Sequence, residues 1–141
     1  MEIENVLFDF NGTIVDDLDL CLDLLNKMLV LRNHLPVNKE KYLEIFEFPV
    51  IEYYKKAGFI FPQDNFAELA DFFIKEYEER NKDCSLQTNI IEILEYLKKL
   101  NKNLYIVSAS EKILLKNQLR KYNIDQYFLD ISGTDNMQQA R

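Results

Sequence analysis

The sequence has few of the residues that characterise secreted or nucleic-acid-binding proteins. It contains two cysteines, one histidine and no tryptophan among 141 residues, and 17 basic side chains stand against 24 acidic ones. Cys21 and Cys84 are isolated and form no CxxC motif, which fits a reducing compartment without a disulfide framework. The net charge of -7 argues against a nucleic-acid surface, because phosphate contacts need clustered lysine and arginine.

Long apolar runs are also missing. The chain begins Met1-Glu2-Ile3-Glu4-Asn5, without the positive and apolar regions of a signal peptide. Its longest apolar stretches are interrupted by Asp, Asn or Lys before they reach membrane-spanning length. We therefore expect a cytoplasmic protein with no membrane segment. The single histidine, His34, stands in a turn beside Pro36 and is a poor candidate for catalysis.

The sequence does contain an alternation of strand and helix patterns. Apolar, β-branched runs predict three strands, at about residues 4–10, 104–107 and 127–132. Residues 89–100 and 111–122 carry apolar side chains at helical spacing, and Ser110 could cap the second of these helices. Strands that alternate with helices predict a parallel sheet of the α/β class, here with about three strands in a Rossmann-like core.

The segment that follows the first strand breaks this alternation. Its apolar residues have helical spacing, and helices are expected at about residues 17–34, 38–46, 49–57 and 65–80. Asn38 and Pro49 are helix-start signals, and Gly58 is a natural helix stop. We therefore predict two domains. Residues 1–16 and 83–141 would form the Rossmann-like core, and residues 17–82 would form a helical domain inserted after the first strand.

The first predicted strand ends at a carboxylate. The run Val6-Leu7-Phe8 leads into Asp9, and Asn11-Gly12-Thr13 follows after one residue. Functional groups of open α/β sheets lie where parallel strands end, and a glycine allows a tight turn there. This segment resembles Asp-x-Asp-Gly-Thr, the first motif of the haloacid dehalogenase superfamily, with Asn11 in place of the second aspartate. The strand end Ile106-Val107-Ser108-Ala109 resembles the second motif of the same superfamily.

The layout is also similar to members of the phosphoglycolate phosphatase and β-phosphoglucomutase type, which carry a helical cap after the first motif. The resemblance implies magnesium-dependent hydrolysis of a small phosphorylated metabolite through an aspartyl-phosphate. Asp9 would then be the nucleophile, and its carboxylate would bind Mg²⁺ together with the backbone carbonyl of Asn11. Thr13 would help to position the phosphate, and the hydroxyl of Ser108 and the amide of Ala109 would bind it.

Asn11 departs from the pattern at the position of the family's acid-base aspartate. An amide can donate a hydrogen bond but cannot deliver or accept a proton near neutral pH, so hydrolysis should be slow. Two alternatives therefore stand beside the phosphatase. The chain could be a catalytically impaired or non-catalytic member that binds phosphorylated ligands, or an N-terminal fragment of a longer active phosphatase.

The family's phosphate-binding lysine and its later acidic pair of metal ligands have no counterpart at the expected places. Lys112 and Lys116 follow Ser108, and Asp135 follows the third strand, but each is more simply a solvated charge. The chain therefore resembles a member that stops early, and its sheet should keep an open edge. We expect this edge to pair with a second copy of the chain if the protein is stable as it stands.

Overall fold

The computed structural model describes residues 3–134 and divides into two compact units. The first unit is formed by the described residues up to Asp17 and from Lys82 onward, and the second is formed by Leu18–Asn81. The chain thus leaves the first unit once and returns to it once. The assignment of residues 17–82 as a cap concerns function and stays a prediction.

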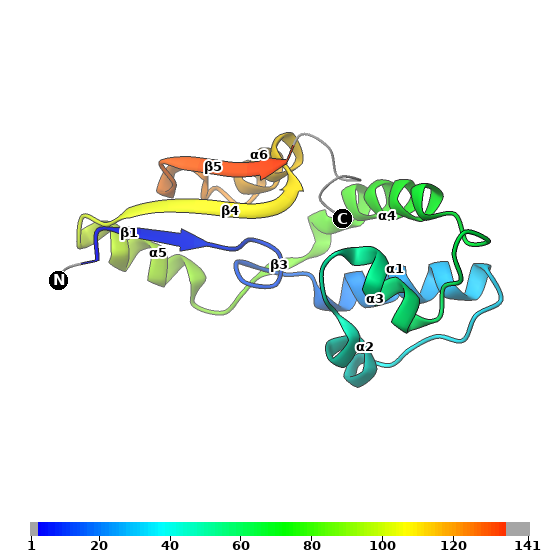
Figure 1. The fold of residues 1–141 in the computed structure, drawn as a ribbon. Helices are drawn as coiled ribbons and strands as arrows, with labels where there is room; N and C mark the ends of the chain where they lie inside the picture. The colour runs from blue at the N-terminus through cyan, green and yellow to red at the C-terminus, as the bar shows by residue number, and fades with distance from the viewer. Residues whose placement is uncertain (1–2, 135–141) are drawn as a thin grey trace. The chain divides into compact units, whose positions relative to one another are not determined.

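The first unit contains a parallel sheet of three strands, drawn as arrows in Figure 1. The strands are β1 (Asn5–Phe8), β4 (Asn103–Glu111) and β5 (Asp130–Thr134), and β4 lies in the middle. In the pairing of β1 with β4, Val6 lies opposite Leu104, and both strands run toward the same end of the sheet. This parallel sheet confirms the α/β class expected from the alternation of strands and helices.

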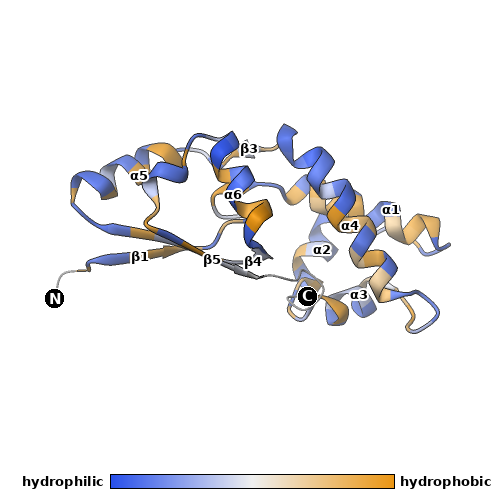
Figure 2. Cartoon of the chain, turned by 90° about the horizontal axis from the view of Figure 1, so that it is seen from above, coloured by the Kyte–Doolittle hydropathy of each residue, from blue (hydrophilic) through white to orange (hydrophobic). Residues whose placement is uncertain are grey.

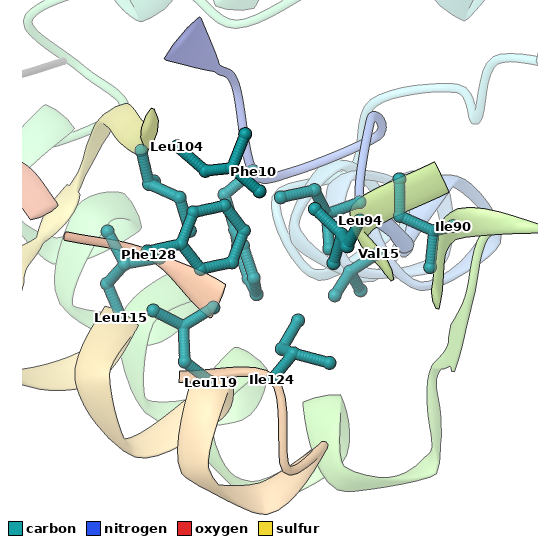
Figure 3. Packing of buried hydrophobic residues seen from close by; sticks show 11 residues of the cluster. Phe10, Val15, Ile90, Leu94, Leu104, Leu115, Leu119, Ile124 and Phe128 are labelled. Carbon is teal, nitrogen blue, oxygen red and sulfur yellow. The ribbon is translucent and has the colours of Figure 1, made fainter. Parts of the chain in front are cut away.

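Two helices of this unit cover the same face of the sheet, as Figure 2 shows. They are α5 (Ile90–Lys99) and α6 (Lys112–Lys121), and a short 3-10 helix, η2 (Asp125–Tyr127), follows α6. Apolar residues of these elements pack against Leu104 and Ile106 of β4, and Figure 3 shows this cluster from close by. Because both strand residues are fully buried, this core fixes the position of β4.

The opposite face of the sheet is apolar but open to solvent. Leu7 and Val107 are 67% and 49% exposed there, and the register places them on the side of Tyr105, away from α5 and α6. Among the described residues β1 pairs with β4 alone, so its outer edge offers backbone groups for a further strand. The pairing of this edge with a second copy of the chain stays a prediction.

A two-stranded antiparallel sheet ties together the segments before and after the helical unit. β2 (Val15–Asp16) pairs with β3 (Ser85–Leu86), with Val15 opposite Leu86. A 3-10 helix, η1 (Asn81–Asp83), precedes β3. This sheet is not predicted from the sequence, because strands of two residues are too short to show a periodicity.

The second unit is helical, as the spacing of its apolar residues predicts. Its helices are α1 (Leu18–Leu31), α2 (Lys39–Ile45), α3 (Val50–Ala57) and α4 (Phe66–Arg80). Asn38 and Asn65 cap α2 and α4, since their side-chain oxygens accept hydrogen bonds from backbone N–H groups of the first turn. No helix in residues 3–134 is long and apolar enough to cross a membrane.

Asparagine replaces glycine at the ends of three helices. Asn33 follows α1, Asn101 follows α5 and Asn123 follows α6, with φ values of 61°, 57° and 57°. Asparagine tolerates this left-handed conformation better than most residues with a Cβ, because its short polar side chain can form local hydrogen bonds. A chain with three glycines therefore still ends its helices in the usual geometry.

The carboxylate of Asp64 links the turn before α4 to the segment after α1. Asp64 Oδ2 lies 2.7 Å from His34 Nε2 and accepts a hydrogen bond of 2.7 Å from Ile60 N. Arg32 Nε lies 4.0 Å from Asp64 Oδ1. Burial raises the pKa of Asp64, but the Ile60 hydrogen bond and the neighbouring His34 and Arg32 outweigh it and hold the pKa below the ordinary value of 3.8.

The Asp64→Asn change should therefore destabilise the protein at neutral pH by about 1–3 kcal/mol, because His34, Arg32 and Ile60 N lose a charged partner. Since the pKa in the folded state is lowered, this stabilisation is present above pH 3.8 and is lost as the pH falls through the lower pKa. Urea unfolding at about pH 7 and about pH 3 measures the difference between the two proteins.

We expect that difference to shrink at the lower pH. Asp19→Asn is the matched control, because the Asp19 side chain is 90% exposed and its ion pair with Lys39 is a surface contact. A difference between wild type and Asp64→Asn that is equal at both pH values would contradict the assignment.

Candidate active site

The candidate site starts with the turn that follows β1. Asp9 is exposed there, and its Oδ1 accepts a hydrogen bond of 2.8 Å from Phe10 N. The carbonyl of Phe10 in turn accepts hydrogen bonds from Thr13 N, Ile14 N and Val15 N, at 3.2, 2.9 and 3.2 Å. These three hydrogen bonds to one carbonyl make the turn tight. The carboxylate of Asp9 therefore lies at the start of a short loop that is held by backbone hydrogen bonds.

Gly12 meets a requirement of the backbone in this turn. Its φ is +80°, a conformation that side chains with a Cβ disfavour, and its N–H donates to Val15 O at 2.9 Å. A Cβ placed on Gly12 would meet nothing within 4 Å. The need for glycine therefore comes from the backbone conformation and not from crowding.

A hydrogen bond joins this turn to the end of β4. Asn11 Nδ2 donates to Ser110 Oγ at 2.9 Å, although the two residues are 99 positions apart. Ser110 N donates to Ser108 Oγ at 3.1 Å, and the Ser110 side chain is buried. The structure therefore brings Asn11, from the first motif, close to the serines of the second.

The prediction that Ser110 caps the helix after it is wrong. Ser110 lies within β4, and the N-cap of α6 is Glu111, whose side chain makes no capping hydrogen bond. The hydroxyl of Ser110 is bound to Asn11 instead. Gly133 of β5 also passes close by, since a Cβ on it would lie 2.8 Å from Ser110 O. Long-range packing has therefore overridden the local capping preference of serine.

Gln87 contacts the same turn, and the sequence analysis did not single it out. Its Nε2 donates to Gly12 O at 3.0 Å, and its backbone N donates to Ile14 O at 2.8 Å. Gln87 directly follows β3, and the pairing of β3 with β2 carries it to the turn. Gln87 could be predicted as part of the site only from the pairing of β2 with β3, and the sequence does not reveal this pairing.

The predicted site residues differ in their exposure. Asp9 and Thr13 are exposed, Asn11 and Ser108 are half-buried, and Ala109 lies in β4 next to Ser108. Their roles as nucleophile, acid-base position, phosphate-binding groups and metal ligands stay predictions.

Three weaker candidates follow the second motif in the sequence. Lys112 begins α6, Lys116 is exposed on that helix, and Asp135 lies outside the described residues.

The turn offers limited ligands for a metal ion. Residues 3–134 contain no group of three or more His, Cys, Asp or Glu side chains arranged to hold a metal. Asp9 supplies one exposed carboxylate, and backbone carbonyls supply further oxygen atoms. Mg²⁺ commonly binds through one or two carboxylates together with substrate phosphates and water, so oxygen ligands of this kind fit an ion shared with the substrate.

Cys84 is not a candidate nucleophile. Burial raises the pKa of its thiol, and the nearby Asp17 raises that pKa further. Tyr122 donates a hydrogen bond of 2.6 Å to Cys84 O, and burial raises the pKa of its phenol to about 12. Both side chains are therefore neutral near pH 7.

Comparison of the sequence with protein families gives a match to the haloacid dehalogenase-like hydrolases over residues 6–141. The chain therefore belongs to this family, as the Asp9 turn and the Ser108 strand indicate. No curated protein matches the sequence.

Solved structures share the fold at low sequence identity. A predicted phosphoglycolate phosphatase from Haemophilus somnus is 22% identical with a TM-score of 0.76, over 94% of this chain and 63% of that one. A predicted phosphatase from Clostridium acetobutylicum is 16% identical with a TM-score of 0.78, over 95% and 62%. A haloacid dehalogenase-like hydrolase from Streptococcus pneumoniae is 21% identical with a TM-score of 0.74, over 94% and 61%. The chain thus spans a little under two thirds of these structures.

Replacing Gly12 with alanine should destabilise the protein by about 1–2 kcal/mol, because a Cβ disfavours the left-handed backbone of the turn. Gly12→Asn should cost less, since asparagine adopts this conformation more readily. Urea unfolding of the three proteins measures both effects. Equal stability of wild type and Gly12→Ala would show that the turn does not need a positive φ.

Proposed function

We propose that the protein hydrolyses a small phosphate monoester at the turn after β1, with Asp9 as the nucleophile. The observation that carries the proposal is the hydrogen bond from Asn11 to Ser110, which holds the Asp9 turn beside the serines at the end of β4. An exposed carboxylate near serine hydroxyls can attack phosphorus while the hydroxyls bind phosphate oxygens. Membership of the haloacid dehalogenase-like hydrolases supports this class of reaction.

In the proposed reaction an oxygen of Asp9 forms a bond to phosphorus, the bond from phosphorus to the ester oxygen breaks, and the alcohol leaves with a proton taken from water. Water then attacks the aspartyl-phosphate and releases inorganic phosphate and the free carboxylate. The hydrogen bond from Phe10 N to Oδ1 orients the carboxylate, so less freedom has to be lost before the attack.

Ser108 would bind a phosphate oxygen. Its Oγ accepts a hydrogen bond from Ser110 N, which leaves the hydroxyl hydrogen to act as a donor in another direction. The backbone N–H of Ala109 and the exposed hydroxyl of Thr13 would add further donors.

Mg²⁺ would be held by the Asp9 carboxylate and the Asn11 carbonyl, together with the phosphate of the substrate. When bound, it supplies the positive charge that offsets the repulsion between a carboxylate and a phosphate.

Asn11 would limit the rate of this reaction. An amide cannot protonate the leaving oxygen or activate water, so this position gives no acid-base assistance. Ser110 Oγ can donate a hydrogen bond as well as accept one, so a carboxylate at position 11 could keep its contact with Ser110. Substitution at this position therefore tests the chemistry without an evident cost in structure.

The first test is the release of inorganic phosphate from a panel of small phosphate esters, with Mg²⁺ and with EDTA. We expect slow, Mg²⁺-dependent turnover by the chain and a fall to the protein-free rate in Asp9→Asn, because the nucleophile is lost. Asp16→Asn is the matched control, since Asp16 is an exposed carboxylate in the neighbouring β2. Turnover of Asp9→Asn at the wild-type rate would remove Asp9 from the mechanism.

The Asn11→Asp change should raise kcat by about 10²–10⁴-fold, the usual contribution of general acid-base catalysis. Steady-state kinetics over a range of pH should also show a new dependence on the ionisation of this carboxylate. Urea unfolding of the variant is the control for an intact fold. An unchanged kcat with an unchanged unfolding midpoint would show that the amide does not limit turnover.

A further inference from the structure

We propose that Gln87 is a positioning residue that fixes the turn carrying Asp9 and Asn11. Gln87 lies outside both predicted motifs, directly after β3. Its Nε2 donates to Gly12 O at 3.0 Å, across 75 positions of the chain. The carbonyl of Gly12 belongs to the Gly12–Thr13 peptide unit, and the preceding unit contains the Asn11 carbonyl, which is the proposed Mg²⁺ ligand. This hydrogen bond therefore restrains the backbone beside that ligand.

The backbone of Gln87 is itself held at both of its polar groups. Its N–H donates to Ile14 O at 2.8 Å, and its carbonyl accepts a hydrogen bond of 3.2 Å from Ile90 N. Ile90 begins α5 and belongs to the buried core of the first unit. The backbone of Gln87 is therefore fixed next to the core. Because of this, little conformational entropy is lost when the side-chain amide of Gln87 binds the turn.

The turn needs such outside support at Gly12. A glycine has the widest choice of backbone conformations, and both Gly12 and Thr13 are exposed, so apolar packing does not hold them. Within the turn, three of the hydrogen bonds converge on Phe10 O and one joins Gly12 N to Val15 O. Gln87 adds a restraint on the remaining polar group of Gly12, its carbonyl.

Two long-range contacts thus hold neighbouring residues of the turn in different ways. Ser110 binds the side chain of Asn11, and Gln87 binds the backbone of Gly12. The effect of Gln87 on turnover rests on the proposed function, whereas its restraint on the turn is independent of any reaction. The two parts can therefore be measured separately.

The test compares Gln87→Met, which keeps the length of the side chain but cannot donate, with Gln87→Lys, which keeps a donor. Amide hydrogen exchange of the full chain, followed by NMR, reports the opening of the turn. The chain has three glycines, so the amide signal of Gly12 is readily assigned. Gln63→Met is the matched control, since Gln63 is exposed in a turn of the other unit.

We expect exchange at Gly12 to be about fivefold faster in Gln87→Met, the effect of losing one net hydrogen bond, and close to wild type in Gln87→Lys. Exchange at the core residues Leu104 and Ile106 should not change. Unaltered exchange at Gly12 in Gln87→Met would overturn the proposal. Equal acceleration at Gly12 and in the core would also overturn it, because Gln87 would then be a general stabiliser.

Kinetics adds a second readout. In Gln87→Met we expect kcat to fall about fivefold with a smaller change in KM, because the turn carries the nucleophile, whereas of the proposed phosphate-binding residues only Thr13 belongs to the turn. A rise in KM at unchanged kcat would contradict the positioning role. Absence of turnover in wild type would overturn the proposed function, and the exchange at Gly12 would still decide whether Gln87 holds the turn.

Discussion

The parallel pairing of β1 with β4 determines where every candidate residue lies. Because Val6 stands opposite Leu104, β1 ends where Phe8 faces Ile106, and the turn after β1 lies beside the last residues of β4. The helical unit separates these strands in the sequence, so the two motifs become neighbours through the register of the sheet, and the hydrogen bond from Asn11 to Ser110 joins them. A slip of one residue would expose the buried Leu104 and Ile106. Burial of the core therefore also sets the geometry of the site.

Local patterns in the sequence were enough to predict most of the secondary structure. The start of α2 at Asn38 and the end of α3 at Gly58 follow from capping preferences, and the α/β class follows from the alternation of strands and helices. These features depend on residues close together in the chain. The same is true of the turn after β1, where Gly12 allows the required positive φ.

The contacts that organise the candidate site could not be predicted in this way. The hydrogen bonds of Asn11 with Ser110 and of Gln87 with Gly12 join residues 99 and 75 positions apart, and the residue types do not specify the partners. Ser110 illustrates the difficulty, because a serine before a helix has the pattern of an N-cap whether or not a distant side chain binds it. The β2–β3 pair was missed for a related reason, since its strands are two residues long.

The chain uses glycine sparingly, and two of its three glycines lie beside the candidate site for different reasons. Gly12 provides a backbone conformation in open space, whereas Gly133 leaves room for the carbonyl of Ser110. The first requirement concerns the turn alone, and the second concerns how closely β5 approaches the end of β4. Both limit the substitutions that the site can accept.

The pair Asn11-Gly12 also has a chemical consequence. In an asparagine that precedes glycine, the backbone nitrogen of the glycine readily attacks the side-chain amide carbon. Ammonia is released, and hydrolysis of the resulting ring leaves a carboxylate. Here Gly12 N donates to Val15 O, and Asn11 Nδ2 donates to Ser110 Oγ, so both reacting groups are restrained. The hydrogen bonds that shape the turn thus slow its deamidation, and they favour an amide at position 11 for as long as the turn stays folded.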